Sequence, residues 1–198
     1  MNKSNVLLVV FLFTLAACSK GTVSGTTGTA APQNTTPSAQ NASGNVSFTA
    51  PDGWVVEKTS SNMRVAQYKL PRESGDGEDG SLVLYYFGQG QGGATQANID
   101  RWISQIHQAD GSDSKDKAKS ETLTVNGLKV SMIDVSGTYS AEMSPGSGDF
   151  TSKPNYRLRA AVIETPKGSY FAKLTGPEKT IARWDQAFRD YINSFQFK

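Results

Sequence analysis

A glycine-rich turn between an apolar segment and an amphipathic segment is the first feature of the sequence that could bind a ligand. Gly88, Gly90 and Gly93 follow residues 82–87 and precede a stretch with helical periodicity. This spacing lets a phosphate approach the amino end of a helix, where backbone N–H groups are unpaired. A dinucleotide site is disfavoured because no second apolar strand with a terminal acidic residue follows about 20 residues on. Two interpretations stay open: a structural turn, or a loop of Gly90, Gly92 and Gly93 that binds another anion or a peptide carboxylate.

Three polar side chains share one face of the helix expected over residues 95–108. Asn98, Arg101 and Gln105 follow one another at intervals of three and four residues, which places them in one stripe. A guanidinium group can bind a carboxylate through two hydrogen bonds, so this stripe is a candidate binding surface for a ligand or a partner. In the alternative interpretation, Arg101 pairs with a neighbouring acid, and Asn98 and Gln105 hydrogen-bond the loop or the sheet backbone.

Patterns typical of catalysis or metal binding are weak. His107 is the only histidine, and a metal site usually needs several His or Cys ligands. Asp76, Glu78 and Asp79 could hold calcium, but Gly77 does not lie where an EF-hand loop would place it. We therefore expect no metal, no cofactor and no catalytic activity. A hydrolase that uses His107 is the least favoured alternative.

The N-terminus has the layout of an export signal. Lys3 is followed by an apolar run at residues 6–13, which is too short to span a bilayer, and then by the tetrapeptide LAAC ending at Cys18. This tetrapeptide resembles the lipobox of bacterial lipoproteins. The resemblance implies a signal peptide at residues 1–17 and acyl chains on Cys18, the chain's only cysteine, that anchor the protein to a membrane of the bacterial cell envelope. Ser19 favours the outer membrane, with the domain at its periplasmic face or the cell surface, because inner-membrane lipoproteins typically carry aspartate there.

Composition divides the mature chain into a tether and a domain. Residues 18–44 consist almost wholly of Ser, Thr, Gly, Ala, Asn, Gln and Pro, so they cannot bury a core and are expected to form a disordered tether. Residues 45–198 have the size of one typical domain. Because 20 Lys and Arg residues are nearly balanced by 18 Asp and Glu residues, nucleic acid is not an indicated partner. The oligomeric state stays open.

Apolar segments separated by turn residues predict a sheet with two helices. The segment at residues 82–87 is apolar on both faces and predicts a central strand that is covered on both sides. Asn126-Gly127 is typical of a two-residue hairpin turn. Apolar stripes predict helices over residues 95–108 and from residue 178 to Phe195. Strands joined mainly by hairpins give an α+β fold, in which a mainly antiparallel sheet is covered by two amphipathic helices. The predicted strands are residues 46–48, 54–56, 63–70, 82–87, 120–125, 128–137, 156–164 and 170–174.

The order of these elements resembles a known fold. The motif Pro51-Asp52-Gly53-Trp54, a central strand before a helix, paired strands and a final helix resemble the PsbP-like α-β-α sandwich. The glycine-rich turn, the stripe on the first helix and the segment from Lys173 to Pro177 also resemble a group of uncharacterised bacterial lipoproteins. Proteins of this fold are mostly non-catalytic. The resemblance therefore implies a lipid-anchored envelope protein that binds a protein partner or aids assembly. The alternative is a receptor for a small anionic ligand or peptide at the glycine-rich loop.

Overall fold

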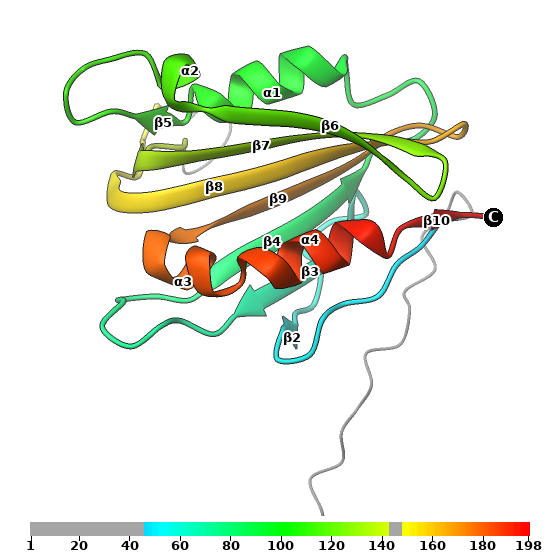
Figure 1. Ribbon diagram of the computed structural model, residues 1–198, viewed down its shortest axis with the longest axis horizontal. Coiled ribbons are helices and arrows are strands. Elements are labelled where there is room, and N and C mark those ends of the chain that lie inside the picture. The colour runs from blue at the N-terminus through cyan, green and yellow to red at the C-terminus, as the bar shows by residue number, and fades with distance from the viewer. Residues whose placement is uncertain (1–45, 143–147) are drawn as a thin grey trace, which may run out of the picture. The chain divides into compact units, whose positions relative to one another are not determined.

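The chain folds around an eight-stranded sheet, in which every described pair of strands is antiparallel (Figure 1). The computed structural model describes residues 46–142 and 148–198. The predicted signal peptide, the tether and Cys18 lie outside the described residues. The strand order is β2-β3-β4-β9-β8-β7-β5, β6 also pairs with β7, and β1 and β10 form a separate two-stranded sheet. The strands are β1 (Val46–Ser47), β2 (Val55–Val56), β3 (Arg64–Leu70), β4 (Gly80–Tyr86), β5 (Ile106–His107), β6 (Lys119–Val125), β7 (Leu128–Tyr139), β8 (Lys153–Glu164), β9 (Tyr170–Pro177) and β10 (Gln196–Phe197).

The predicted hairpin turn between β6 and β7 is confirmed. Val125 pairs with Leu128, and the two residues between them have φ angles of 48° at Asn126 and 82° at Gly127. Two successive positive φ angles define the type of turn that matches the twist of a two-residue hairpin. This turn fixes the register of the long strand β7.

Helices lie on both faces of the sheet, as Figure 1 shows. On one side, α1 (Thr95–Ile103) buries Trp102 against the sheet, and the short helix α2 (Ser114–Lys117) follows it. On the other side, α3 (Glu178–Arg183) and α4 (Asp185–Asn193) cover the larger core. The predicted α+β class with a mainly antiparallel sheet is confirmed. None of the helices in the described part of the chain is both long and apolar enough to cross a membrane.

The first amphipathic helix is shorter than the sequence predicted. It ends at Ile103 instead of continuing to residue 108, and the following segment forms β5, which pairs with β7. Gly137 of β7 permits this pairing because it has no side chain. A Cβ atom there would clash with the carbonyl oxygen of His107, at a distance of 2.6 Å. Ile106 remains 2% exposed, so its apolar side chain is buried from a strand as well as it would be from a helix.

The last helix is divided in two, and the prediction of one continuous helix is wrong. α3 ends at Arg183 and α4 begins at Asp185. At the break, the indole N–H of Trp184 donates to the carbonyl oxygen of Pro71 at 2.9 Å. Phe195 is fully buried but follows α4 instead of lying on it. The break turns the amino end of α4 toward the sheet.

The strand predicted to be covered on both faces is buried in its middle, but its last two residues are only half-buried. On the α3–α4 side of β4, Leu82 and Leu84 are 0% exposed. On the other side Val83 is buried, whereas Tyr85 is only half-buried. This difference arises because α1 packs mainly on β7 and β8, so the end of β4 has no helix over it.

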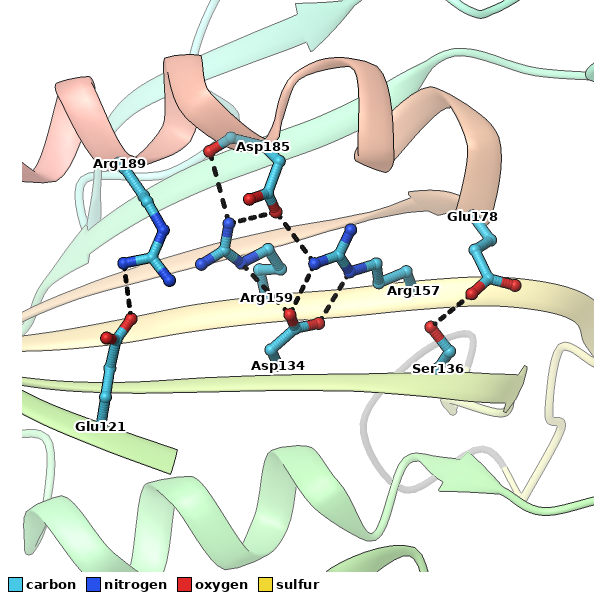
Figure 2. A network of polar contacts seen from close by, with 8 residues as sticks. All are labelled: Glu121, Asp134, Ser136, Arg157, Arg159, Glu178, Asp185 and Arg189. Carbon is cyan, nitrogen blue, oxygen red and sulfur yellow. Dashed lines mark hydrogen bonds and ion pairs between the residues drawn. The ribbon is translucent and has the colours of Figure 1, made fainter. Parts of the chain in front are cut away.

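A network of ion pairs around the buried side chain of Arg159 fastens the amino end of α4 to the sheet (Figure 2). Arg159 of β8, with a side chain 1% exposed, donates to the carboxylate of Asp185. Arg157 donates to both oxygens of Asp134, at 2.7 and 2.5 Å, and to Asp185 at 2.9 Å. Burial alone would raise the pKa of Asp134, but the two arginines outweigh it and hold the pKa below its ordinary value. The guanidinium of Arg159 also lies over the ring of Phe188, 5.1 Å from its centroid.

Two outer contacts join the same layers on either side of this network (Figure 2). Arg189 of α4 pairs with Glu121 of β6 at 2.8 Å. At the other end, the hydroxyl of Ser136 donates to Glu178 of α3 at 3.0 Å. These contacts are more exposed than the central one, so the Arg159–Asp185 pair should dominate the energetics.

We predict that Asp185→Asn lowers the free energy of unfolding by about 2 kcal/mol, because it leaves the buried guanidinium of Arg159 without its nearest charge. Urea unfolding of the full chain at neutral pH measures the change. Asp190→Asn is the matched control on the same helix, since Asp190 is exposed and its carboxylate accepts a hydrogen bond from the neutral side chain of Gln186. Equal effects of the two substitutions would contradict a structural role for the network.

Candidate anion-binding groove

An open groove lies between α1 and the part of the sheet that α1 does not cover. α1 has nine residues and is therefore about 14 Å long, too short to shield the whole face. The groove has a volume of about 440 Å³, which lies within the range of small-molecule sites. Aromatic side chains of β4 and polar side chains of α1 and β9 line it.

Lys173 of β9 lies at the base of this groove. Its register partners on the neighbouring strands, Val83 and Ala160, are both buried, so Lys173 occupies the middle of the sheet. Its ammonium donates to Oε1 of Gln105 at 2.6 Å and to the hydroxyl of Tyr139 at 3.0 Å. Both partners are neutral. In residues 46–142 and 148–198, Lys173 forms no ion pair.

The surroundings of Lys173 disfavour its positive charge. Burial lowers the pKa of Lys173 from its ordinary 10.5 to about 8, and the positive charge of Arg101 adds to the shift. The ammonium is still mostly protonated at neutral pH. A half-buried cation with only neutral hydrogen-bond partners is stabilised by an anion that reaches it.

Arg101 brings a second positive charge to the groove. It is exposed on α1, and Nη2 donates to the side-chain oxygen of Asn98 at 2.7 Å. Pairing with a neighbouring acid, the alternative considered for Arg101, does not occur within the described residues. Glu142, the acid that also lines the groove, accepts a hydrogen bond from the backbone N–H of Gly148 at 3.0 Å. Among the described residues, the guanidinium of Arg101 thus donates to the neutral Asn98 and forms no ion pair.

The predicted polar stripe divides into two parts. Arg101 and Gln105 both line the groove. Asn98 is 4% exposed, and its amide nitrogen donates to the carbonyl oxygens of Gly92 and Ala94 at 2.8 and 3.0 Å. Asn98 thus ties the glycine-rich loop to the helix, which is the contact expected by the alternative interpretation.

The glycine-rich loop packs against the base of the groove. Gly90, Gly92 and Gly93 have φ angles of 72°, 91° and 79°. A Cβ atom at Gly92 would lie 2.6 Å from the ring of Phe171, so the missing side chain lets the loop pack on that ring. The strand before the loop pairs only with antiparallel neighbours, whereas a dinucleotide-binding unit needs parallel strands.

The other residues considered for chemistry have separate surroundings. His107 is exposed on β5. Asp76 accepts hydrogen bonds from the start of α3, Glu78 from β8, and Asp79 from the backbone of its own loop. In the part of the chain that the structure describes, no three His, Cys, Asp or Glu side chains lie together where they could hold a metal ion.

Sequence reasoning missed the residue at the base of the groove. Lys173 interrupts an apolar strand, between Ala172 and Leu174, which are both 0% exposed. A lysine inside such a segment was the available signal, since long charged side chains are rarely buried without a partner. Its hydrogen-bond partner Tyr139 gave no signal, because the pairing joins distant parts of the sequence.

Comparisons with known proteins give matches of fold only. No protein-family model matches the chain, and no curated protein matches it. Several solved structures are similar to it. A protein of unknown function from Pseudomonas aeruginosa, PA94, is 16% identical with a TM-score of 0.41, over 75% of this chain and 88% of its own. Cyanobacterial PsbP (CyanoP) from Synechocystis is 12% identical with a TM-score of 0.45, over 78% and 87% of the two chains. LpqN, involved in cell envelope biogenesis of Mycobacterium tuberculosis, is 14% identical with a TM-score of 0.44, over 77% and 83%.

We predict that Lys173→Met raises the free energy of unfolding by about 2 kcal/mol at neutral pH, because it removes a disfavoured buried charge while conserving volume. Below pH 8 Lys173 is protonated in both the folded and the unfolded state, so the wild type bears the full free-energy cost of holding this charge in the folded protein. Between about pH 8 and 10.5 Lys173 is protonated only in the unfolded chain, so the free energy of unfolding of the wild type rises with pH. The difference in stability between Lys173→Met and the wild type therefore disappears across this range.

Denaturant unfolding of both proteins across this pH range is the measurement. Lys129→Met is the control, because the Lys129 side chain is 61% exposed and should change stability little. A Lys173→Met variant that is less stable than the wild type at neutral pH would mean that the contacts of Lys173 outweigh its burial.

Proposed function

We propose that this chain is a lipid-anchored, non-catalytic binding protein of the bacterial envelope, and that the groove beside α1 receives the anionic group of a small ligand. The observation that carries the proposal is the pair of positive charges in the groove. Lys173 and Arg101 lack acidic partners among the described residues, and a carboxylate placed between them would supply the missing charge. The groove's other lining is largely aromatic, so the ligand should also have an apolar body.

The proposal includes no catalytic step. The single histidine, His107, is exposed on β5, and in the described residues no hydroxyl is bonded to it as a nucleophile would be. The lipid anchor comes from the lipobox resemblance at Cys18. It would hold the domain at the membrane through the segment at residues 18–44 while leaving the groove open to solutes of the envelope.

A protein partner is the second candidate, and one observation favours it. Phe150 is 63% exposed, and it lines a shallower depression that also includes Arg101 and Gln105. A large exposed aromatic side chain beside a binding groove is typical of protein interfaces. In this case the anionic group would belong to an acidic side chain or to a chain terminus of the partner.

A simple carboxylate with an apolar body tests the function. We expect cyclohexylacetate, added at ten times its Kd, to raise the melting temperature of the full chain in detergent by about 4 °C. The neutral amide, cyclohexylacetamide, should have no such effect, because it carries no charge for Lys173 and Arg101. The shift in melting temperature should disappear in Lys173→Met. In Arg101→Ala the affinity for cyclohexylacetate should fall at least tenfold.

The control is Lys129→Met, which removes a positive charge from β7 outside the groove and should keep the full shift. An equal response to the amide, or an undiminished response in Lys173→Met, would contradict anion binding in the groove.

A further inference from the structure

The wall of the groove opposite α1 is built from two parallel aromatic rings. Tyr85 and Phe87 lie at the end of β4, with ring centroids 5.9 Å apart and ring planes only 3° from parallel. Both side chains are half-buried and line the groove. Tyr85 of β4 and Phe87, which directly follows the strand, stack on each other and together form an aromatic wall of the groove.

The base of the groove holds this wall in place. Phe171 is 1% exposed and meets the ring of Phe87 edge-on, with centroids 5.6 Å apart. Trp102 of α1 meets Phe171 in the same way, at 6.4 Å. A Cβ atom at Gly92 would lie 3.0 Å from the Phe87 ring and 2.6 Å from the Phe171 ring, so the glycine-rich loop closes over both. The wall is therefore fixed by packing before any ligand arrives.

Three charged residues line the groove with this wall: Arg101 of α1, Lys173 of β9 and Glu142. Lys173 lies on the strand next to β4, and the carboxylate of Glu142 accepts a hydrogen bond from the backbone N–H of Gly148. Arg64 of β3 lies over the outer ring, 5.6 Å from the centroid of Tyr85, which adds a positive charge behind the wall. A ligand that fills the groove thus meets the cations Lys173 and Arg101 as well as the aromatic rings of the wall.

We infer that the ligand is a small aromatic carboxylate, whose carboxylate lies between Lys173 and Arg101 and whose ring packs against Tyr85 and Phe87. This inference rests on the proposed function, which requires only an anion with an apolar body. Aromatic rings gain more from packing against aromatic faces than saturated rings of similar size do, because the ring quadrupoles interact favourably in offset or edge-on arrangements. The wall should therefore distinguish ligands by the planarity of their bodies.

The test compares phenylacetate with cyclohexylacetate, which has the same carboxylate on a saturated ring. Calorimetric titration of the full chain in detergent should give a Kd for phenylacetate at least fivefold lower than for cyclohexylacetate. In Phe87→Leu and in Tyr85→Leu the ratio of the two Kd values should fall toward one. Phe150→Leu, which changes an exposed aromatic outside the groove, should leave the ratio unchanged.

The outcomes separate this inference from the proposed function. Equal binding of the two acids by the wild type, or a ratio that survives both wall substitutions, would overturn the aromatic assignment and leave the anion site standing. Binding of neither acid would contradict the proposed function, and the inference would fail with it. Two wall variants are needed, so that a folding defect in one does not decide the result.

Discussion

The ammonium of Lys173 is largely withdrawn from water and has only neutral hydrogen-bond partners among the described residues. On the opposite face of the same sheet, Arg159 is buried more deeply still, but Asp185 and Asp134 lie beside it. Acidic side chains thus compensate the charge of Arg159, which has a structural role. Among the described residues Lys173 has no acid paired with it, and half-buried charges without an opposite charge are concentrated at functional sites. This contrast between the two faces is the reason for treating the groove as a binding site.

The two faces divide stability and binding between them. α3 and α4 cover the larger core, and the Arg157–Arg159 network fastens them to β7 and β8. On the other face, α1 stops at Ile103 and the chain returns as β5, so Gln105 falls in the connection, where it reaches Lys173. A helix that continued past Ile103 would have included Gln105. The early end of α1 therefore creates the groove, and the rigid sheet beneath it holds the groove's side chains in fixed positions.

Local patterns predicted the fold better than the site. Asn126-Gly127 fixed a hairpin through its own backbone preferences, and alternating apolar residues located most strands. The helix ends were wrong because tertiary contacts decided them: Gly137 admits β5, and Trp184 interrupts the last helix to reach Pro71. Of the candidate stripe, Arg101 and Gln105 reach the groove, but Lys173 was missed. Its importance depends on burial and on partners far away in the sequence, which no local pattern encodes.

The pKa of the Lys173 side chain is the most direct test of this account, and NMR titration of the lysine side-chain signals of the full chain can measure it, with Lys173→Met identifying the resonance. The account predicts a pKa of about 8 in the free protein, instead of the ordinary 10.5. It also predicts that a bound carboxylate raises this pKa, because the anion stabilises the protonated form. An ordinary pKa that does not respond to carboxylate would contradict the claim that the groove is built around a half-buried cation without an acidic partner.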